Sequence, residues 1–247
     1  TIRGWSTING RRYFFDSSTA MVTGWKKEDG KWYYLRSGGD MATGWVKVAG
    51  SWYYMDSEGV MLTGWLKDGN NWYWLRSNGA AATGWTNVAG AWYLFEDDAR
   101  MLTGWQLTED DNRWYYMRPN GHMVTGWLLD GGKWYYLDDE GAMKTGWTKV
   151  GDTWYHLDSS GAMSTGWLLD GAWYWLDSNS GAMATGTVTV EGRASTFASS
   201  GAWLGYADSI ESQAASPSAS NGAPVTNASG QRLIMSAPTA SRAELID

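Results

Sequence analysis

Tryptophan is the residue whose number and spacing could carry chemistry in this chain. The 247 residues include 20 tryptophans and 14 tyrosines, and many of the tryptophans fall into pairs such as Trp25 and Trp32. A packing core normally uses Leu, Ile and Val, whereas each indole carries an N–H that needs a partner. We therefore expect partly exposed indole faces, which can hold a quaternary ammonium by cation–π attraction or stack on a sugar.

These tryptophans recur with a fixed period, which indicates how they are positioned. A Gly-Trp dipeptide repeats every 20 residues, with a single step of 22, and its tryptophans are Trp5, Trp25, Trp45, Trp65, Trp85, Trp105, Trp127, Trp147 and Trp167. A period of this size is typical of repeat architectures, in which each unit is one small element that its neighbours must cover.

Each repeat has the punctuation of a β-hairpin. In the third repeat an apolar run, Trp45 to Val48, is separated from an aromatic run, Trp52 to Met55, by Ala49-Gly50. Two such runs around a glycine-containing turn predict two antiparallel strands. An isolated hairpin is marginally stable at best, so neighbouring hairpins must bury one another. We expect an all-β array of about nine to ten stacked hairpins.

Composition and charge exclude several function classes. The net charge of −7 disfavours nucleic acid as a partner, and the absence of cysteine removes disulfide frameworks and thiolate sites. No run approaches the ~18 apolar residues of a membrane span. His122 and His156 lie far apart, and no nucleophile with a base, paired catalytic carboxylates or phosphate loop is recognisable. No catalytic residue, metal site or cofactor is expected.

Alternation along the second run divides its residues between two faces. Tyr53 and its equivalents are tyrosine in every repeat, and Met55 and its equivalents are always apolar, so we assign this face to structural packing. The opposite face carries Trp52 and Tyr54, and the second of these positions varies among repeats. This variable face is predicted to carry the site.

The full repeat resembles a known family. The pattern Gly-Trp-x₆-Trp-Tyr-Tyr-Leu-Asp-x₂-Gly-Ala-Met-x-Thr-Gly-Trp, as in residues 126–147, is similar to the cell-wall-binding repeat of choline-binding modules in Gram-positive surface proteins and phage lysins, and the resemblance covers about residues 1–203. It implies a left-handed β-hairpin solenoid in which choline lies between consecutive hairpins. Its cage consists of the two tryptophans of one repeat, an aromatic residue of the next repeat's second strand, and a nearby methionine.

Transferred residue by residue, the resemblance implies five complete cages. They are Trp25, Trp32 and Tyr54; Trp45, Trp52 and Trp74; Trp85, Trp92 and Tyr116; Trp105, Trp114 and Tyr136; and Trp147, Trp154 and Trp175. The closing methionines are Met61, Met123, Met143 and Met183, and Ala81 stands where one is missing.

Four other pairs depart from the pattern and are predicted to be weak or empty. Trp65 and Trp72 face Leu94, Trp127 and Trp134 face His156, Trp167 and Trp173 face Thr196, and Trp5 is paired with Arg12 against Tyr34. The Arg12 site should actively repel a cation.

The function implied by the resemblance is anchoring to choline-bearing teichoic or lipoteichoic acid at the bacterial cell surface. One cage should bind at about millimolar concentration, and several along one array become an avid anchor. A glucan-binding module of the glucosyltransferase or clostridial-toxin type is the main alternative, and a structural stalk is another. Family members also form end-to-end dimers, and they commonly carry a separate peptidoglycan hydrolase domain.

The domain organisation follows from composition. We expect a repeat array over residues 1–206, of which 187–206 form a degenerate capping repeat with Thr187 and Ala194 at the tryptophan positions. An Ala-, Ser-, Pro- and Asn-rich disordered linker is predicted at 207–230, and the start of a truncated second domain at 231–247. Because the chain opens in the middle of a repeat, we interpret it as part of a longer protein.

Overall fold

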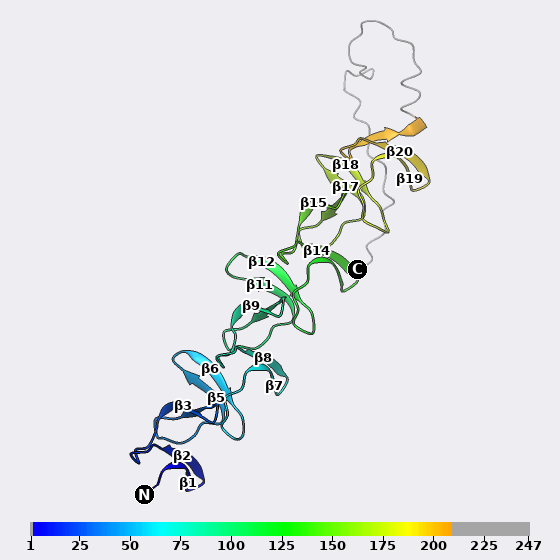
Figure 1. Cartoon of the computed structure of the whole chain (residues 1–247). Helices are drawn as coiled ribbons and strands as arrows, with labels where there is room; N and C mark the ends of the chain where they lie inside the picture. The colour runs from blue at the N-terminus through cyan, green and yellow to red at the C-terminus, as the bar shows by residue number, and fades with distance from the viewer. Residues whose placement is uncertain (1, 209–247) are drawn as a thin grey trace, which may run out of the picture. The chain divides into compact units, whose positions relative to one another are not determined.

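The computed structural model describes residues 2–208, and these residues form an all-β chain of repeated hairpins (Figure 1). The all-β fold class and the hairpin repeat are therefore confirmed. Linker residues 209–230 and the predicted second domain at 231–247 lie outside the described residues. Within residues 2–208, no helix is long and apolar enough to cross a membrane.

The chain divides into two compact units, of which the first is Thr1–Val124. Its strands are β1 (Gly4–Ile8), β2 (Arg11–Phe15), β3 (Gly24–Glu28), β4 (Lys31–Leu35), β5 (Gly44–Val48), β6 (Ser51–Met55), β7 (Gly64–Asp68), β8 (Asn71–Leu75), β9 (Gly84–Val88), β10 (Ala91–Phe95), β11 (Gly104–Thr108) and β12 (Arg113–Met117). They pair two by two into antiparallel hairpins.

The second unit is Thr125–Asp247. Its strands are β13 (Gly126–Asp130), β14 (Lys133–Leu137), β15 (Gly146–Val150), β16 (Thr153–Leu157), β17 (Gly166–Asp170), β18 (Ala172–Leu176), β19 (Gly186–Val190), β20 (Arg193–Phe197) and β21 (Trp203–Tyr206). The last three form one sheet in the order β19-β20-β21, so the degenerate repeat has an extra strand.

Tight turns fix the register of the hairpins. Between β3 and β4, Asp29 and Gly30 both have positive φ, 49° and 79°, which are the angles of the type I′ turn that suits the twist of paired strands. The resulting register places Trp25 opposite Tyr34 and Lys27 opposite Trp32. Because side chains alternate along a strand, these four residues share one face of the hairpin.

The core lies at the base of the hairpins. The final residue of the second strand is almost fully buried in most repeats, at 0–1% exposure, as seen for Leu35, Met55, Leu75, Met117, Leu137, Leu157 and Leu176. This confirms the predicted packing role of that position. Each of these residues also forms a β-bridge with the loop that follows it, as Met55 does with Met61.

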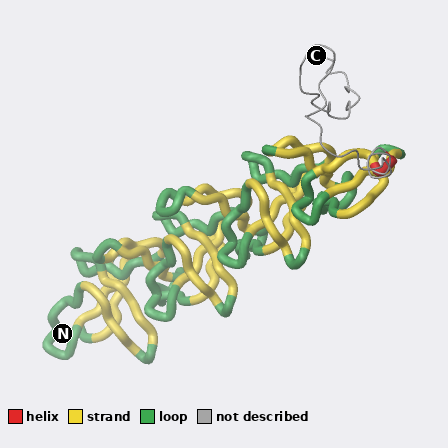
Figure 2. The backbone as a smooth tube through the Cα atoms, turned by 90° about the horizontal axis from the view of Figure 1, so that it is seen from above, coloured by secondary structure: helices red, strands yellow, loops and turns green. Residues whose placement is uncertain are grey.

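Successive hairpins are joined by backbone hydrogen bonds within each unit. Met61 N–H donates to the carbonyl of Trp32 in the preceding hairpin at 2.8 Å, whereas the next N–H, of Leu62, donates to Tyr54 in its own hairpin at 2.9 Å. The second unit repeats this arrangement, with a 2.7 Å bond from Met163 to Trp134. Within a unit, neighbouring hairpins therefore have a fixed rotation, and their strands run in different directions (Figure 2).

Candidate functional site

Three pockets of closely similar construction lie between hairpins. The first has a volume of about 320 Å³ and is lined by Trp25, Trp32, Tyr53, Met61, Ser77 and Asn78. The second, of about 370 Å³, is lined by Trp65, Trp72, Tyr93, Met101, Pro119, Asn120 and His122. The third, of about 280 Å³, is lined by Trp127, Trp134, Tyr155, Met163, Asn179 and Ser180. Each combines two tryptophans, one tyrosine and one methionine.

The two tryptophans of each pocket form a corner. In the first pocket the ring centroids of Trp25 and Trp32 are 6.3 Å apart and their planes meet at 89°. The same near-perpendicular pair, at 6.2–6.5 Å and 80–89°, occurs in seven of the described hairpins. Trp32 remains 40% exposed and Trp134 41% exposed, so these rings are open to a ligand.

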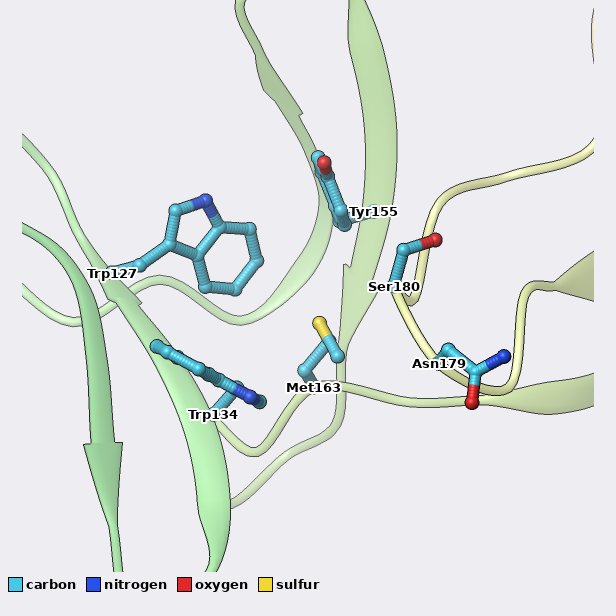
Figure 3. Close-up of a pocket in the computed structure, with 6 residues that line it drawn as sticks. All are labelled: Trp127, Trp134, Tyr155, Met163, Asn179 and Ser180. Carbon is cyan, nitrogen blue, oxygen red and sulfur yellow. The ribbon is translucent and has the colours of Figure 1, made fainter.

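The third wall comes from the next hairpin. Tyr53 on β6 lies against Trp25, with ring centroids 4.8 Å apart, and Tyr155 on β16 lies against Trp127 at the same distance. Figure 3 shows the rings of Trp127, Trp134 and Tyr155 around an open space, with Met163 beside it.

The methionine is held by both neighbouring repeats. Its N–H is bonded to the preceding hairpin, as described for Met61, and its sulfur packs on a glycine of the following loop. A Cβ added to Gly79, where φ is +83°, would lie only 2.2 Å from the Met61 sulfur. The same loop contributes Ser77 and Asn78 to the pocket. Each pocket therefore draws on three consecutive repeats.

The predicted third rings are corrected by the structure. Tyr54, Trp74, Tyr116, Tyr136 and Trp175 each lie on the first tryptophan of their own hairpin, at 5.1–5.4 Å. They are its cross-strand partners, as the pairing of Trp45 with Tyr54 illustrates. The face that turns back toward the preceding hairpin is the one carrying Tyr53, which the sequence assigned to structural packing.

Two pockets predicted to lack a third ring have one. Tyr93 completes the corner of Trp65 and Trp72 at 4.9 Å from Trp65. Leu94, which was predicted to face Trp65 and Trp72, is instead buried and lies opposite Trp85 in its own hairpin.

His156 is likewise directed away from the pocket of Trp127 and Trp134. It lies 2.9 Å from the Ser164 hydroxyl and packs against Trp147 of its own hairpin. The methionines Met101 and Met163 were missed with these two pockets. The position of Tyr93 and Tyr155 holds tyrosine in all nine repeats, and this uniformity was the sequence signal that could have identified the third ring of both pockets.

The other predicted pairs adopt related arrangements. Trp85 and Trp92 form a corner, and the ring centroid of Tyr115 lies 4.8 Å from that of Trp85. The Met123 N–H donates to the backbone carbonyl of Trp92 at 2.9 Å.

Trp147 has Tyr174 as its neighbour at 4.7 Å, and Met183 N–H is bonded to Trp154 at 2.8 Å. The Trp147 indole N–H donates to Asp170 at 2.8 Å.

In the first unit, Trp105 and Trp114 form a corner with ring centroids 6.5 Å apart. In the second unit, the Met143 sulfur packs on Gly161.

One corner is closed by alanine. Trp45 and Trp52 meet Tyr73 at 4.6 Å from Trp45, and the methionine position holds Ala81. Ala99, with φ of 70° and no exposed surface, stands where other repeats have the glycine beneath the sulfur. Where Ala81 replaces the methionine, Ala99 therefore replaces the glycine, and its methyl group occupies the place that a methionine sulfur takes in other repeats.

The two ends of the array differ from the rest. The guanidinium of Arg12 lies 4.6 Å from the centroid of the Trp5 ring, so this protein supplies its own cation there. In the last tryptophan hairpin, Trp167 is surrounded by Trp173 at 6.2 Å, Trp203 at 5.7 Å and Phe197 at 6.0 Å. Whether either end binds a ligand stays a prediction.

The chemistry of the pockets favours a cation without N–H groups. The residues lining the three pockets include no Asp, Glu, Lys or Arg. The Tyr93 phenol is uncharged at neutral pH, and burial raises its pKa further above the ordinary value. The Asn78 amide oxygen already accepts the Ala80 N–H at 3.0 Å. Aromatic faces attract a quaternary ammonium through their quadrupoles without any hydrogen bond, whereas a primary ammonium also needs an acceptor for each of its N–H groups.

Comparisons with known proteins agree with this geometry. A family profile described as "Choline-binding repeat" matches residues 2–43, 42–83, 82–120, 111–145 and 144–187. A search of curated proteins found no match.

Several solved structures are similar. CbpJ from Streptococcus pneumoniae TIGR4 is 35% identical with a TM-score of 0.68, over 82% of this chain and 88% of that one. Choline-binding protein F from Streptococcus pneumoniae, solved in the presence of a peptidoglycan analogue, is 33% identical with a TM-score of 0.64, over 82% and 86%. The modular autolysin LytC from the same species is 26% identical with a TM-score of 0.59, over 82% of this chain and 47% of that one. With a family profile covering most of its length and repeated aromatic corners of one design, the chain belongs to the choline-binding repeat family.

Proposed function

We propose that this chain is a non-catalytic module that anchors its parent protein to the bacterial surface by binding choline or phosphocholine groups of teichoic and lipoteichoic acids. The observation that carries the proposal is the recurring uncharged pocket of two perpendicular tryptophans, one tyrosine and one methionine. A trimethylammonium group presents a diffuse positive charge on an apolar surface, which matches ring faces and a thioether better than hydrogen-bonding groups.

The expected affinities suit an anchor built from many weak sites. Three aromatic faces at about 0.5–2 kcal/mol each give a few kcal/mol, so one pocket binds choline at roughly millimolar concentration. Several pockets on one chain convert later contacts with a polymer into intramolecular ones, and the overall avidity can exceed the single-site affinity by about 10²–10⁴. The array would therefore retain a choline-bearing polymer while releasing free choline rapidly.

Titration with matched small ligands tests the proposal. Choline should quench or shift tryptophan fluorescence at millimolar concentration and raise the melting temperature, because each pocket filled at tenfold its Kd adds about 1.4 kcal/mol to the folded state. Ethanolamine, which has the same length but a primary ammonium, should have a much smaller effect. A response to dextran instead of choline would favour a glucan-binding module, and no response to either would favour a structural stalk.

The similarity to a modular autolysin supports a further part of the proposal. We expect the parent protein to carry a separate domain, such as a peptidoglycan hydrolase, which these repeats would hold at its polymeric substrate. The prediction can be checked by testing whether the parent protein loses wall binding, and retains hydrolysis of soluble fragments, when the repeats are removed.

A further inference from the structure

The residue opposite the second tryptophan differs from pocket to pocket. In each hairpin it stands two positions after the first tryptophan, on the face that also carries the tryptophan pair. These cross-strand neighbours are Lys27 with Trp32, Lys47 with Trp52, Lys67 with Trp72, Asn87 with Trp92, Leu107 with Trp114, Leu129 with Trp134, Lys149 with Trp154, and Leu169 with Trp173.

Three of the lysines place their charge over the pocket tryptophan. The ammonium nitrogen lies 5.6 Å from the ring centroid for Lys27, 5.5 Å for Lys47 and 5.9 Å for Lys67, within the range of a cation–π contact. Among residues 2–208, none of these ammonium groups has an ion pair with a carboxylate. Their charge therefore lies beside the second tryptophan of the corner without an ion-pair partner among the described residues, and we call this position the rim of the pocket.

The leucine pockets lack this charge altogether. Leu129 is 54% exposed beside Trp134, so the third pocket has an apolar side chain at the same rim position. The third pocket also has the tyrosine and the methionine, Tyr155 and Met163, in place. Its lining loop differs as well, because Asp177, which accepts hydrogen bonds from Asn179 and Ser180, stands where the loop of the first pocket has Arg76. Substitutions at the rim residue are therefore needed to isolate its charge.

A rim lysine acts oppositely on the two forms in which choline occurs. It repels the ammonium of free choline, and its own contact with the tryptophan weakens the ring as a cation acceptor. It attracts the phosphate of phosphocholine, which is joined to the ammonium by an ethylene bridge. At roughly 8 Å and a dielectric constant between about 40 and 80, a unit charge changes the binding of another by about two- to sixfold.

We propose that the residue opposite the second tryptophan sets which headgroup each pocket prefers. Pockets with Lys27 or Lys67 select choline that carries a phosphate, whereas the pocket with Leu129 accepts free choline equally well or better. This inference rests on the proposed choline-binding function and adds a specificity determinant to it. The array accordingly mixes the two kinds of position, because the first unit also has Asn87 and Leu107 and the second also has Lys149 opposite the second tryptophan.

The pocket methionines allow each site to be observed separately in the whole chain. Protein labelled with ¹³C-methyl methionine is titrated with choline and with phosphocholine, following the methyl resonances of Met61, Met101 and Met163, each assigned by its Met→Leu variant. In the unsubstituted chain, the ratio of the choline Kd to the phosphocholine Kd should be at least threefold larger at Met61 and Met101 than at Met163.

Charge substitutions then test the cause of that ratio. Lys27→Leu should lower the ratio at Met61 at least threefold, and Leu129→Lys should raise it at Met163 by a similar factor. The matched control is Lys31→Leu, which removes the same charge from the opposite face of the hairpin. Both effects should collapse in 1 M salt, where the screening length is about 3 Å and where a merely structural role would persist.

The outcomes separate this inference from the function on which it rests. Equal ratios at the three methionines, or equal effects of the Lys27 and Lys31 substitutions, would overturn the rim-charge assignment while leaving choline binding intact. No methyl shift with either ligand at any pocket would refute the proposed function itself.

Discussion

The identity of the third ring gives the sharpest prediction about the site. The structure places Tyr53 against Trp25 at 4.8 Å, whereas Tyr54 lies on Trp45 in its own hairpin at 5.2 Å. Tyr53→Leu should therefore weaken choline binding in the first pocket, and Tyr54→Leu should leave that pocket largely unchanged. Leucine keeps the position apolar, so the substitution removes the ring face with little loss of burial.

The magnitude follows from the contact that is lost. One desolvated aromatic face contributes about 0.5–2 kcal/mol to holding a cation, so the Kd should rise roughly 2- to 30-fold in Tyr53→Leu. Tyr53→Phe retains the ring and should bind nearly as well as the original chain. The pocket of Trp127, Trp134 and Tyr155 lies in the other compact unit and serves as the internal reference.

Site-resolved titration provides the assay. The methyl resonance of Met61 reports the first pocket and that of Met163 reports the reference pocket. Only the Met61 response should move to higher choline concentration in Tyr53→Leu. If Tyr54→Leu weakens the Met61 response and Tyr53→Leu does not, the assignment of walls made from the structure is wrong.

Three other substitutions test separate features. Gly79→Ala should lower the free energy of unfolding by at least about 1–2 kcal/mol and weaken the adjoining pocket, because the new methyl group clashes with the Met61 sulfur in addition to the strain of positive φ. Gly69→Ala is the control, since Gly69 has a φ of +59° but open space around it, and this variant should lose less stability in the same thermal melt. Arg12→Trp should add one choline site in a calorimetric titration, since the guanidinium now over the first ring is replaced by a pocket wall, and an unchanged stoichiometry would show that this end is closed for another reason. Hydrogen bonds from Ser160 lower the pKa of Asp158 below its ordinary value of 3.8. The stabilisation that this carboxylate gives to the folded state is therefore present above pH 3.8 and is lost as the pH falls through the folded-state pKa. Asp158→Asn should flatten the fall in melting temperature below about pH 4, and an unchanged acid transition would contradict this.

The hairpins and their core could be predicted from the sequence because they depend on short-range pattern. A fixed period, glycine-containing turns and strand alternation determine that Trp25 and Lys27 share a face and that Leu35 is buried. These features need no knowledge of how one hairpin is placed on the next. The resemblance to a repeat family added the expectation that two tryptophans and a methionine meet, and Trp25, Trp32 and Met61 line one pocket in the structure.

The third wall could not be obtained in that way, because it depends on the rotation between successive hairpins. That rotation is set by contacts between repeats, such as the bond from Met61 N–H to Trp32 and the packing of the Met61 sulfur on Gly79. Strand alternation distinguishes the faces of Tyr53 and Tyr54 without saying which one turns toward the preceding hairpin. The predicted third ring was therefore displaced by one residue in every cage. For the same reason, the pockets completed by Tyr93 and Tyr155 were predicted to lack a third ring.

The assembly of each pocket from three repeats has a consequence for recombining such chains. Excising β5 and β6 with their following loop would take Tyr53 and Met61 from one ligand position and Trp45 and Trp52 from the next. A block of three hairpins is thus the smallest part that contains one whole ligand position. Because successive positions share hairpins, each further hairpin in an engineered array should add one site, with the outermost hairpins serving as scaffolding.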